Sequence, residues 1–416
     1  MVWLGGLIVL LTFAGIVKKY ETRMVLIAGG LLMCIVSGKI GAAVTSFTTS
    51  MVNPGLVTVI CIVYGFSVVM KWTKCDAHMV HLIVKPLKSV KAIMIPGTIV
   101  ITWLICIALP SAAGCAAAVG SILIPALMSA GVHPAIAAGS VMLGTWGGVL
   151  SPGGSHNAFM AKMVNTDVMS IIAVHTVPAI IGALVSIVVF TALAIYRKEH
   201  MGFHSENEIK DDDGFKVNYL WAIIPILPLI LLVLGSKQVG VLPAISVPQA
   251  MLLGVIIAMA VTRQNPGEIT KQFFGGMGEA FGSIIGIIIA AGVFTAGMKA
   301  IGLTDALIVA MKNSQSIAKL AASYGPFIIA ILGGSGDAAT LAFNGAITPH
   351  AKSFGMGVAQ MGSLAQLSGA LGRTMSPVAG AAIVCAQIAK VNPMEMSKRT
   401  ALPMVVTATV IMFLLS

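Results

Sequence analysis

Long apolar segments separated by short polar loops restrict this chain more than any other feature. Runs such as Val2–Val17 recur along all 416 residues, and only 9% of the residues are charged. A helix crosses the hydrocarbon core of a bilayer with about 20 mostly apolar residues. Because the mean hydropathy is +0.99, the sequence predicts an all-α membrane protein with many spanning helices.

The basic residues give the expected orientation of the chain. The net charge is +11, but the lysines and arginines lie in short loops between apolar runs, which excludes a nucleic-acid-binding surface. With both termini outside the cell, 17 of the 25 basic residues fall in cytoplasmic loops and 7 in outer loops. This bias follows the positive-inside rule and predicts two periplasmic termini. Arg373 is left inside a span.

The predicted spans form two similar halves. Residues 1–196 form the first half, 219–416 form the second, and the polar stretch 197–218 is expected to be a cytoplasmic linker. The pairs Ser151-Pro152 and Ser376-Pro377 correspond at an offset of 225 positions. Five crossings per half, about ten in all, would make the halves antiparallel, which is the inverted repeat of secondary transporters. Single spans are expected near 2–17, 24–37, 54–70, 168–196, 219–236, 247–262, 278–297 and 400–416.

Two further segments are split by small residues and are predicted to be re-entrant hairpins. They cover about 92–130 and 320–349, with tips at LPSAAG (109–114) and GGSGD (333–337). Non-helical backbone at membrane depth is tolerated only inside protein or around a cavity. The alternative is a flexible glycine-rich packing seam, which matching places in both halves disfavour.

Two crossing segments are interrupted by a proline between glycines. The first, about 133–163, carries GGVLSPGGSHN at 147–157, and the second, about 357–390, carries GRTMSPVAG at 372–380. Proline cannot donate a backbone hydrogen bond, so a plain kink is one interpretation. Matched breaks instead favour discontinuous helices at the midplane. Together with the hairpin tips they would place four helix N-termini there, which favours an anion.

Arg373 needs a partner in such apolar surroundings. A central arginine costs about 2.5–3.5 kcal/mol on insertion scales, so it should face a cavity. Its planar fork matches a carboxylate, which indicates an anionic substrate. The alternative is a structural ion pair with Asp337, an acidic residue in the second predicted tip.

The most specific segments are GSGDAATLAFN (334–344), TPHA (348–351) and LGRTMSPVAG (371–380). They resemble the C-type anaerobic four-carbon dicarboxylate carriers of the ion transporter superfamily, distant relatives of the divalent-anion/sodium symporters. The resemblance implies transport of succinate, fumarate, malate or aspartate across a bacterial inner membrane, by an elevator-type mechanism and as a homodimer. Residues 153–157 depart from the pattern, and neither tip carries Ser-Asn-Thr. The coupling ion is therefore left open between H⁺ and Na⁺.

These considerations define the candidate site. The candidate coupling-ion ligands are Asp337, Thr340 and Asn344. No enzymatic motif and no organic cofactor are expected; a cation/proton antiporter of the same superfamily and a channel are the alternative functions. The candidate substrate-binding residues are Arg373, Thr374, Ser376, Pro377, Ser151, Gly153, Ser155, His156, Asn157, Ser111, Ser335 and Gly336.

Overall fold

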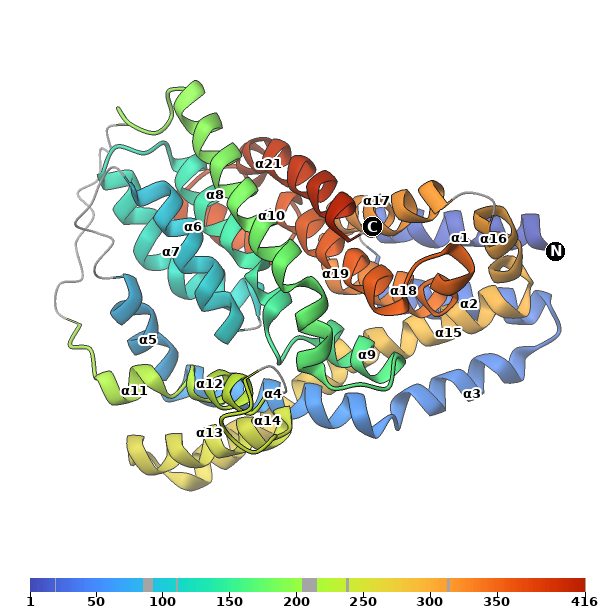
Figure 1. Ribbon diagram of the computed structural model, residues 1–416, viewed down its shortest axis with the longest axis horizontal. Helices are drawn as coiled ribbons and strands as arrows, with labels where there is room; N and C mark the ends of the chain where they lie inside the picture. The colour runs from blue at the N-terminus through green and yellow to red at the C-terminus, as the bar shows by residue number, and fades with distance from the viewer. Residues whose placement is uncertain are drawn as a thin grey trace.

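The computed structural model describes residues 1–18, 20–84, 93–109, 111–203, 215–236, 239–312 and 315–415, and these contain helices and connections without a strand (Figure 1). The helices are α1 (Val2–Val17), α2 (Thr22–Val36), α3 (Ile40–Met51), α4 (Pro54–Trp72), α5 (Cys75–Val84), α6 (Met94–Ala108), α7 (Ala112–Ser129), α8 (Pro134–Gly144), η3 (Thr145–Leu150), α9 (Ser155–Met163), α10 (Val168–Tyr196), α11 (Tyr219–Ile223), α12 (Leu227–Leu234), α13 (Val247–Thr262), α14 (Pro266–Ala280), η4 (Phe281–Ile285), α15 (Gly286–Ala300), α16 (Leu303–Lys312), α17 (Gln315–Gly333), α18 (Gly336–Ala346), η5 (Thr348–Phe354), α19 (Val358–Met375), α20 (Gly380–Ala389) and α21 (Pro393–Leu414).

The helices are apolar enough for a membrane protein. Within the described residues, four helical stretches are long enough to cross a bilayer by length and composition: Ala112–Ser129, Val168–Tyr196, Pro266–Ala300 and Pro393–Leu414. The pair α3 and α4, bent by 48°, would make a fifth, and shorter apolar helices accompany them. The fold class is therefore an all-helical membrane protein, while ten crossings and two re-entrant hairpins stay predictions.

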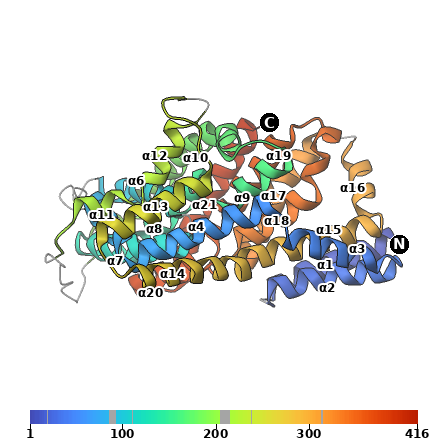
Figure 2. The same cartoon turned by 90° about the horizontal axis from the view of Figure 1, so that it is seen from below.

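The helices pack into two bodies. The hairpin body consists of α6–α10 and α17–α21, whose shared core includes Trp146, Phe190 and Phe354. The frame consists of α1–α4 and α11–α15, held by smaller apolar clusters. In Figure 1 the frame runs below and to the right of the hairpin body, and Figure 2 shows α4, α13 and α14 in front of it. α5 connects α4 of the frame to α6 of the hairpin body, and α16 connects α15 of the frame to α17 of the hairpin body.

The order of helices recurs between the two halves. The first residues of α10 and α21, 168 and 393, are 225 positions apart, and α6–α9 have matching counterparts in α17–α20. The packing is reciprocal. In the repeat, α2, α3 and α4 correspond to α13, α14 and α15. Helices α2 and α3 pack on α15, and helices α13 and α14 pack on α4. A twofold-related pair of repeats makes such contacts. The opposite orientation of the two halves in the membrane stays a prediction.

The helix breaks occur in the predicted segments. Residues 151–154 separate η3 from α9, and residues 376–379 separate α19 from α20. Short turns also separate α6 from α7 and α17 from α18. Pro110 of the first tip and 204–214 of the linker lie outside the described residues.

The span expected at 278–297 was placed wrongly at its start. The helix is continuous from Pro266 to Ala300. Asn265 caps it by accepting the backbone N–H of Gly267 at 2.8 Å, and proline is favoured in a first turn. The charged residues Glu268 and Lys271 lower the local hydropathy, which hid the first turns from the sequence analysis.

Three other boundaries also differ from the expectation. The predicted span 219–236 is two short helices, because Pro225 and Pro228 interrupt the hydrogen-bond ladder between them. The Ser- and Thr-rich stretch Ile40–Met51 is a helix that the sequence analysis did not assign. The last helix begins at Pro393 rather than near residue 400.

Because α21 begins at Pro393, Arg399 lies in a helix and is buried, whereas the sequence analysis placed it in a loop. Its guanidinium donates from Nε and Nη2 to the carboxylate of Glu199, at 2.8 and 2.5 Å, and from Nη1 to the carbonyl of Glu395 at 2.7 Å. Burial alone would raise the pKa of Glu199, but the bond from Arg399 and the charges of Arg399 and Arg197 outweigh it and lower the pKa. The pair ties the end of the first half to the last helix of the second.

We expect Arg399→Met to destabilise the protein by about 3 kcal/mol, because the largely buried Glu199 carboxylate loses its two bonds from Arg399 and keeps only the longer contact with Arg197, at 3.4 Å. The double variant Glu199→Leu with Arg399→Met should recover much of this loss. Thermal and denaturant unfolding of purified protein would measure both. A single variant as stable as the wild type would contradict the assignment.

The same pair predicts an acid dependence of stability. The pKa of Glu199 is lower in the folded protein than its ordinary value of 4.5. Its stabilising contribution is therefore fully present above pH 4.5 and is lost as pH falls through the lowered pKa. Melting temperatures measured between neutral and acidic pH should fall less steeply for the double variant than for the wild type.

Candidate binding site

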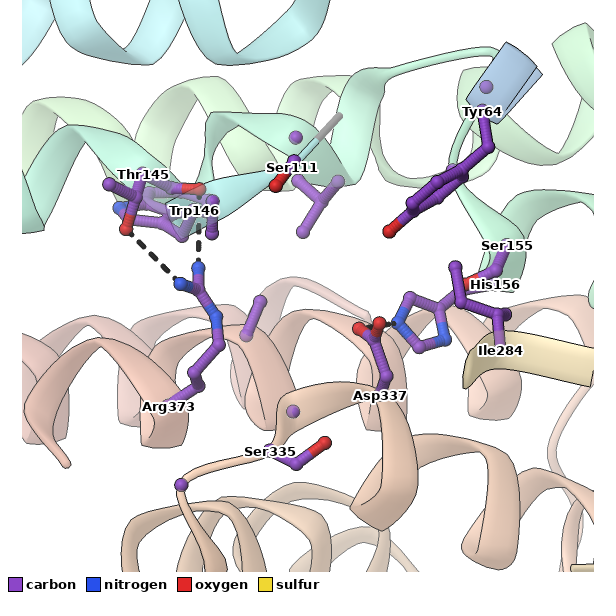
Figure 3. A pocket seen from close by; sticks show the side chains of 18 residues that line it. Tyr64, Ser111, Thr145, Trp146, Ser155, His156, Ile284, Ser335, Asp337 and Arg373 are labelled. Atoms are coloured by element: carbon purple, nitrogen blue, oxygen red, sulfur yellow. Dashed lines mark hydrogen bonds and ion pairs between the residues drawn. The ribbon is translucent and has the colours of Figure 1, made fainter. Parts of the chain in front are cut away.

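A cavity of about 230 Å³ lies between the hairpin body and the frame (Figure 3). It has room for a small organic molecule. Most of its lining belongs to the hairpin body. The lining residues are Tyr64, Ser111, Ala112, Thr145, Trp146, Gly148, Val149, Gly153, Gly154, Ser155, His156, Ile284, Gly334, Ser335, Gly336, Asp337, Ala370 and Arg373.

Three helix N-termini meet at this cavity. Ser111 caps α7 and accepts the N–H of Gly114 at 3.2 Å, Ser335 caps α18, and Gly154 is the N-cap of α9. Each N-terminus carries roughly half a positive charge and unpaired N–H groups, so together they favour an anion. The fourth expected end, that of α20, does not contribute to the lining.

The second tip depends on a glycine. Gly334 has a positive φ of 73°, and a Cβ there would lie 2.9 Å from the carbonyl oxygen of Val378. A larger residue would be strained in this conformation and would collide with the break between α19 and α20. Gly334 therefore lets the start of α18 approach that break and reach the cavity.

Arg373 lies in the last turn of α19, at one end of the cavity. Its Nη1 donates to Thr145 Oγ1 at 3.3 Å and its Nη2 to the Thr145 carbonyl at 3.2 Å. Thr145 is the first residue of η3, where the α-helical ladder of α8 ends. A guanidinium has five N–H donors, so these two bonds fix its direction and leave donors for a ligand.

Asp337 lies at the other end, in the first turn of α18. Its Oδ1 is 2.7 Å from Nε2 of His156, which comes from the start of α9 (Figure 3). The Asp337 side chain is 48% exposed, and it faces the cavity. The ion pair with Arg373, the alternative considered from the sequence, is not formed in this structure, because the two residues have separate partners at separate ends.

The structure gathers eight of the predicted site residues around the cavity. They are Ser111, Gly153, Ser155, His156, Ser335, Gly336, Asp337 and Arg373. They come from four separate segments, one from each hairpin tip and one from each broken helix. Their roles toward a ligand stay predictions.

Five predicted binding residues do not line the cavity. Ser151 is 2% exposed, and its hydroxyl accepts the backbone N–H of Gly153 at 3.3 Å. Asn157 donates to the carbonyls of Val149 and Ser151, both at 2.9 Å, and so holds the first break. Ser376 donates to the carbonyl of Ile331 at 2.6 Å. The fully buried Thr374 bonds within its own helix, and Pro377 does not contribute to the lining.

Two predicted coupling-ion ligands also lie outside the cavity. Thr340 donates to the carbonyl of Ala365 at 3.3 Å, and Asn344 donates to that of Gly362 at 3.2 Å. Both bonds join α18 to α19, so these buried side chains fix how the two helices pack. Of the three predicted ligands, only Asp337 reaches the cavity.

Sequence analysis missed the frame's contribution to the site. Tyr64 of α4 points its hydroxyl into the cavity, and Ile284 of η4 lies beside His156 (Figure 3). A lone tyrosine in an apolar span gives no sign that it faces a cavity rather than lipid. Thr145 was also missed, because a threonine at a helix end is common.

The sequence of this chain is similar to those of known transporters. The chain is 41% identical over 266 residues to a putative uncharacterized transporter of Haemophilus influenzae, covering 61% of this chain and 95% of that protein. It is 24% identical to the anaerobic C4-dicarboxylate transporter DcuC of Escherichia coli K12, over 95% of this chain and 92% of the relative. A Vibrio cholerae protein described as a probable transporter of this kind is 25% identical over 93% of this chain and 91% of its own.

The family match spans nearly the whole chain. The sequence profile of the DcuC family, described as C4-dicarboxylate anaerobic carriers, matches residues 4–416. Both helix breaks, both tips and every residue around the cavity fall within that match. The chain is thus a transporter rather than an enzyme, and it belongs to the C4-dicarboxylate anaerobic carrier family.

Proposed function

We propose that this protein carries C4-dicarboxylates such as succinate, fumarate and malate across the bacterial inner membrane, and that the 230 Å³ cavity is the substrate site. The observation that carries the proposal is the charge pattern: Arg373 at one end, three helix N-termini around the wall, and the His156–Asp337 pair at the other end. The relatives' names supply the substrate class.

The charges suit a dianion. One substrate carboxylate would take the free donors of Arg373, while the other would lie near the N-terminus of α9 or α18 and His156. Three N-termini contribute roughly half a positive charge each, which adds to the full charge of Arg373 and exceeds the negative charge of Asp337. A monocarboxylate would leave one end of this arrangement unpaired.

Most residues that line the cavity come from the hairpin body, which suits an elevator-type movement. Of the lining residues, only Tyr64 and Ile284 belong to the frame, so nearly the whole site would travel with the hairpin body. Sliding of one packed body along another is an established form of conformational change. The two tips and two breaks would then move together, and substrate would keep its contacts during the crossing.

Asp337 is the group best placed to couple transport to a cation. Its carboxylate faces the cavity and hydrogen-bonds His156, so it can take a proton or contribute an oxygen to Na⁺. Both ions remain candidates. Among the described residues, no group of three or more His, Cys, Asp or Glu is arranged to hold a metal ion.

Arg373→Lys should bind succinate more weakly without unfolding, because lysine keeps the charge but loses the planar fork. Losing one charge-assisted bidentate contact should cost about 1.5–3 kcal/mol, or roughly tenfold to more than a hundredfold in affinity. Calorimetry on purified protein would measure it. Arg23→Lys is a matched control, since Arg23 bonds the Gly282 carbonyl in the frame. Wild-type affinity in folded Arg373→Ala would show that the arginine is structural.

Asp337→Asn should flatten the dependence of succinate uptake on pH or on sodium, because asparagine cannot exchange a proton and is a weaker cation ligand. Counterflow of labelled succinate in proteoliposomes, with pH and sodium varied separately, would separate the two ions. Asp305→Asn, on α16 away from the cavity, is the control. An unchanged ion dependence would remove Asp337 from coupling. Sodium–proton exchange without any succinate counterflow would instead support the antiporter alternative.

A further inference from the structure

The binding cavity adjoins a larger one on a single side. This first vestibule, of about 460 Å³, lies between α4, α5, α7 and the end of α14, and it contains Lys71. Tyr64 and Ser111 line both the binding cavity and the vestibule. The two cavities therefore adjoin at Tyr64 and Ser111, on the side that the positive-inside bias predicts to be cytoplasmic.

A second vestibule of about 330 Å³ lies between α3, α15, α9 and α18 and contains Lys299. Its lining shares no described residue with that of the binding cavity. Seven of its positions are repeat counterparts of positions that line the first vestibule, at separations of 224–228 residues. The pairs are Gly292 with Tyr64, Thr295 with Ser67, Ala296 with Val68, Lys299 with Lys71, Leu341 with Ala117, Gly345 with Ser121, and Asn53 with Glu279.

We propose that the second vestibule is the access route to the site from the opposite, periplasmic side, and that Lys299 attracts the anionic substrate into it. The inference deepens the proposed function and rests on it. A carrier built from two repeats would have two equivalent cavities. In any one access state, one cavity would adjoin the binding site and the other would be separated from it.

Apolar packing separates the second vestibule from the site. Leu341 is 1% exposed and packs with Phe159 and Ile288 in a cluster that spans α18, α9 and α15. Gly292, the repeat counterpart of Tyr64, lies where α15 packs on α3. A Cβ at Gly292 would lie 2.7 Å from Ser50 Oγ, so α3 and α15 already touch there. Moving the hairpin body would pull Phe159 and Leu341 away from this wall.

The two vestibules differ in charge. The first combines Lys71 and His81 with the carboxylates of Asp76 and Glu279. In the second, Asn53 stands in place of Glu279, and Lys299 is accompanied by no acidic residue of the described lining. A cleft lined by one sign of charge raises the local concentration of an oppositely charged substrate. The second vestibule is therefore the more attractive of the two to a dianion.

Transport measured from each side tests the role of Lys299. In right-side-out vesicles at low salt, Lys299→Gln should raise the KM for external succinate by roughly threefold or more, and high salt should shrink the difference. Lys71→Gln is the matched variant and should act on the KM in inside-out vesicles instead. Lys352→Gln, an exposed lysine outside both vestibules, should change neither. Equal effects of Lys299→Gln on both sides, or none, would overturn the steering role.

Chemical labelling tests the route without using transport. All six native cysteines are buried, so an added cysteine should dominate labelling by a charged, membrane-impermeant thiol reagent. Thr295→Cys should react from outside and Ser67→Cys from inside. Reaction of both from one side would disprove the two-route arrangement. If the wild-type protein showed no dicarboxylate counterflow but the two cysteines were labelled as expected, the proposed substrate would be wrong. The proposal of two access routes would still hold.

Discussion

The need to hydrogen-bond every backbone group away from water governs this structure. A membrane helix meets that need along its own length, and each break exposes N–H and C=O groups that must find other partners. Four of these interruptions, at the two predicted hairpin tips and the two helix breaks, lie in the hairpin body. Ser111 and Ser335 cap the tips, and Asn157 takes up two carbonyls at the first break. The N–H groups left at the helix starts line the cavity.

Much of this arrangement is readable from local sequence. Proline removes a backbone donor and glycine permits a positive φ, so Ser376-Pro377 and Gly334 mark places where a helix cannot continue. Apolar runs likewise identify buried helices. The start of α14 was not readable from hydropathy, because a capped first turn with exposed charged residues lowers hydropathy without ending the helix. Asn265 and Pro266 carried the missing signal, in the form of a cap and a first-turn proline.

The partners inside the site depend on three-dimensional packing. Asp337 and His156 are 181 positions apart, and Arg373 meets Thr145 across 228. Sequence places each of these groups near a break, but it cannot say which break faces which. The ion pair between Arg373 and Asp337, the alternative that the sequence left open, is not formed, because each residue has a separate partner. Thr340 and Asn344 lie on the helix that follows the acidic tip, yet their side chains turn toward α19 rather than the cavity.

The pair between Arg399 and Glu199 has a consequence for how the protein is made. The two residues are 200 positions apart, and α21 follows every other described helix in the sequence. At about 5–20 residues per second, a ribosome produces Arg399 roughly 10–40 s after Glu199. During that interval the Glu199 carboxylate lacks the guanidinium of Arg399. α21, which is synthesised after every other described helix, therefore completes the first half as well as the second, and a chain truncated before α21 leaves both unfinished.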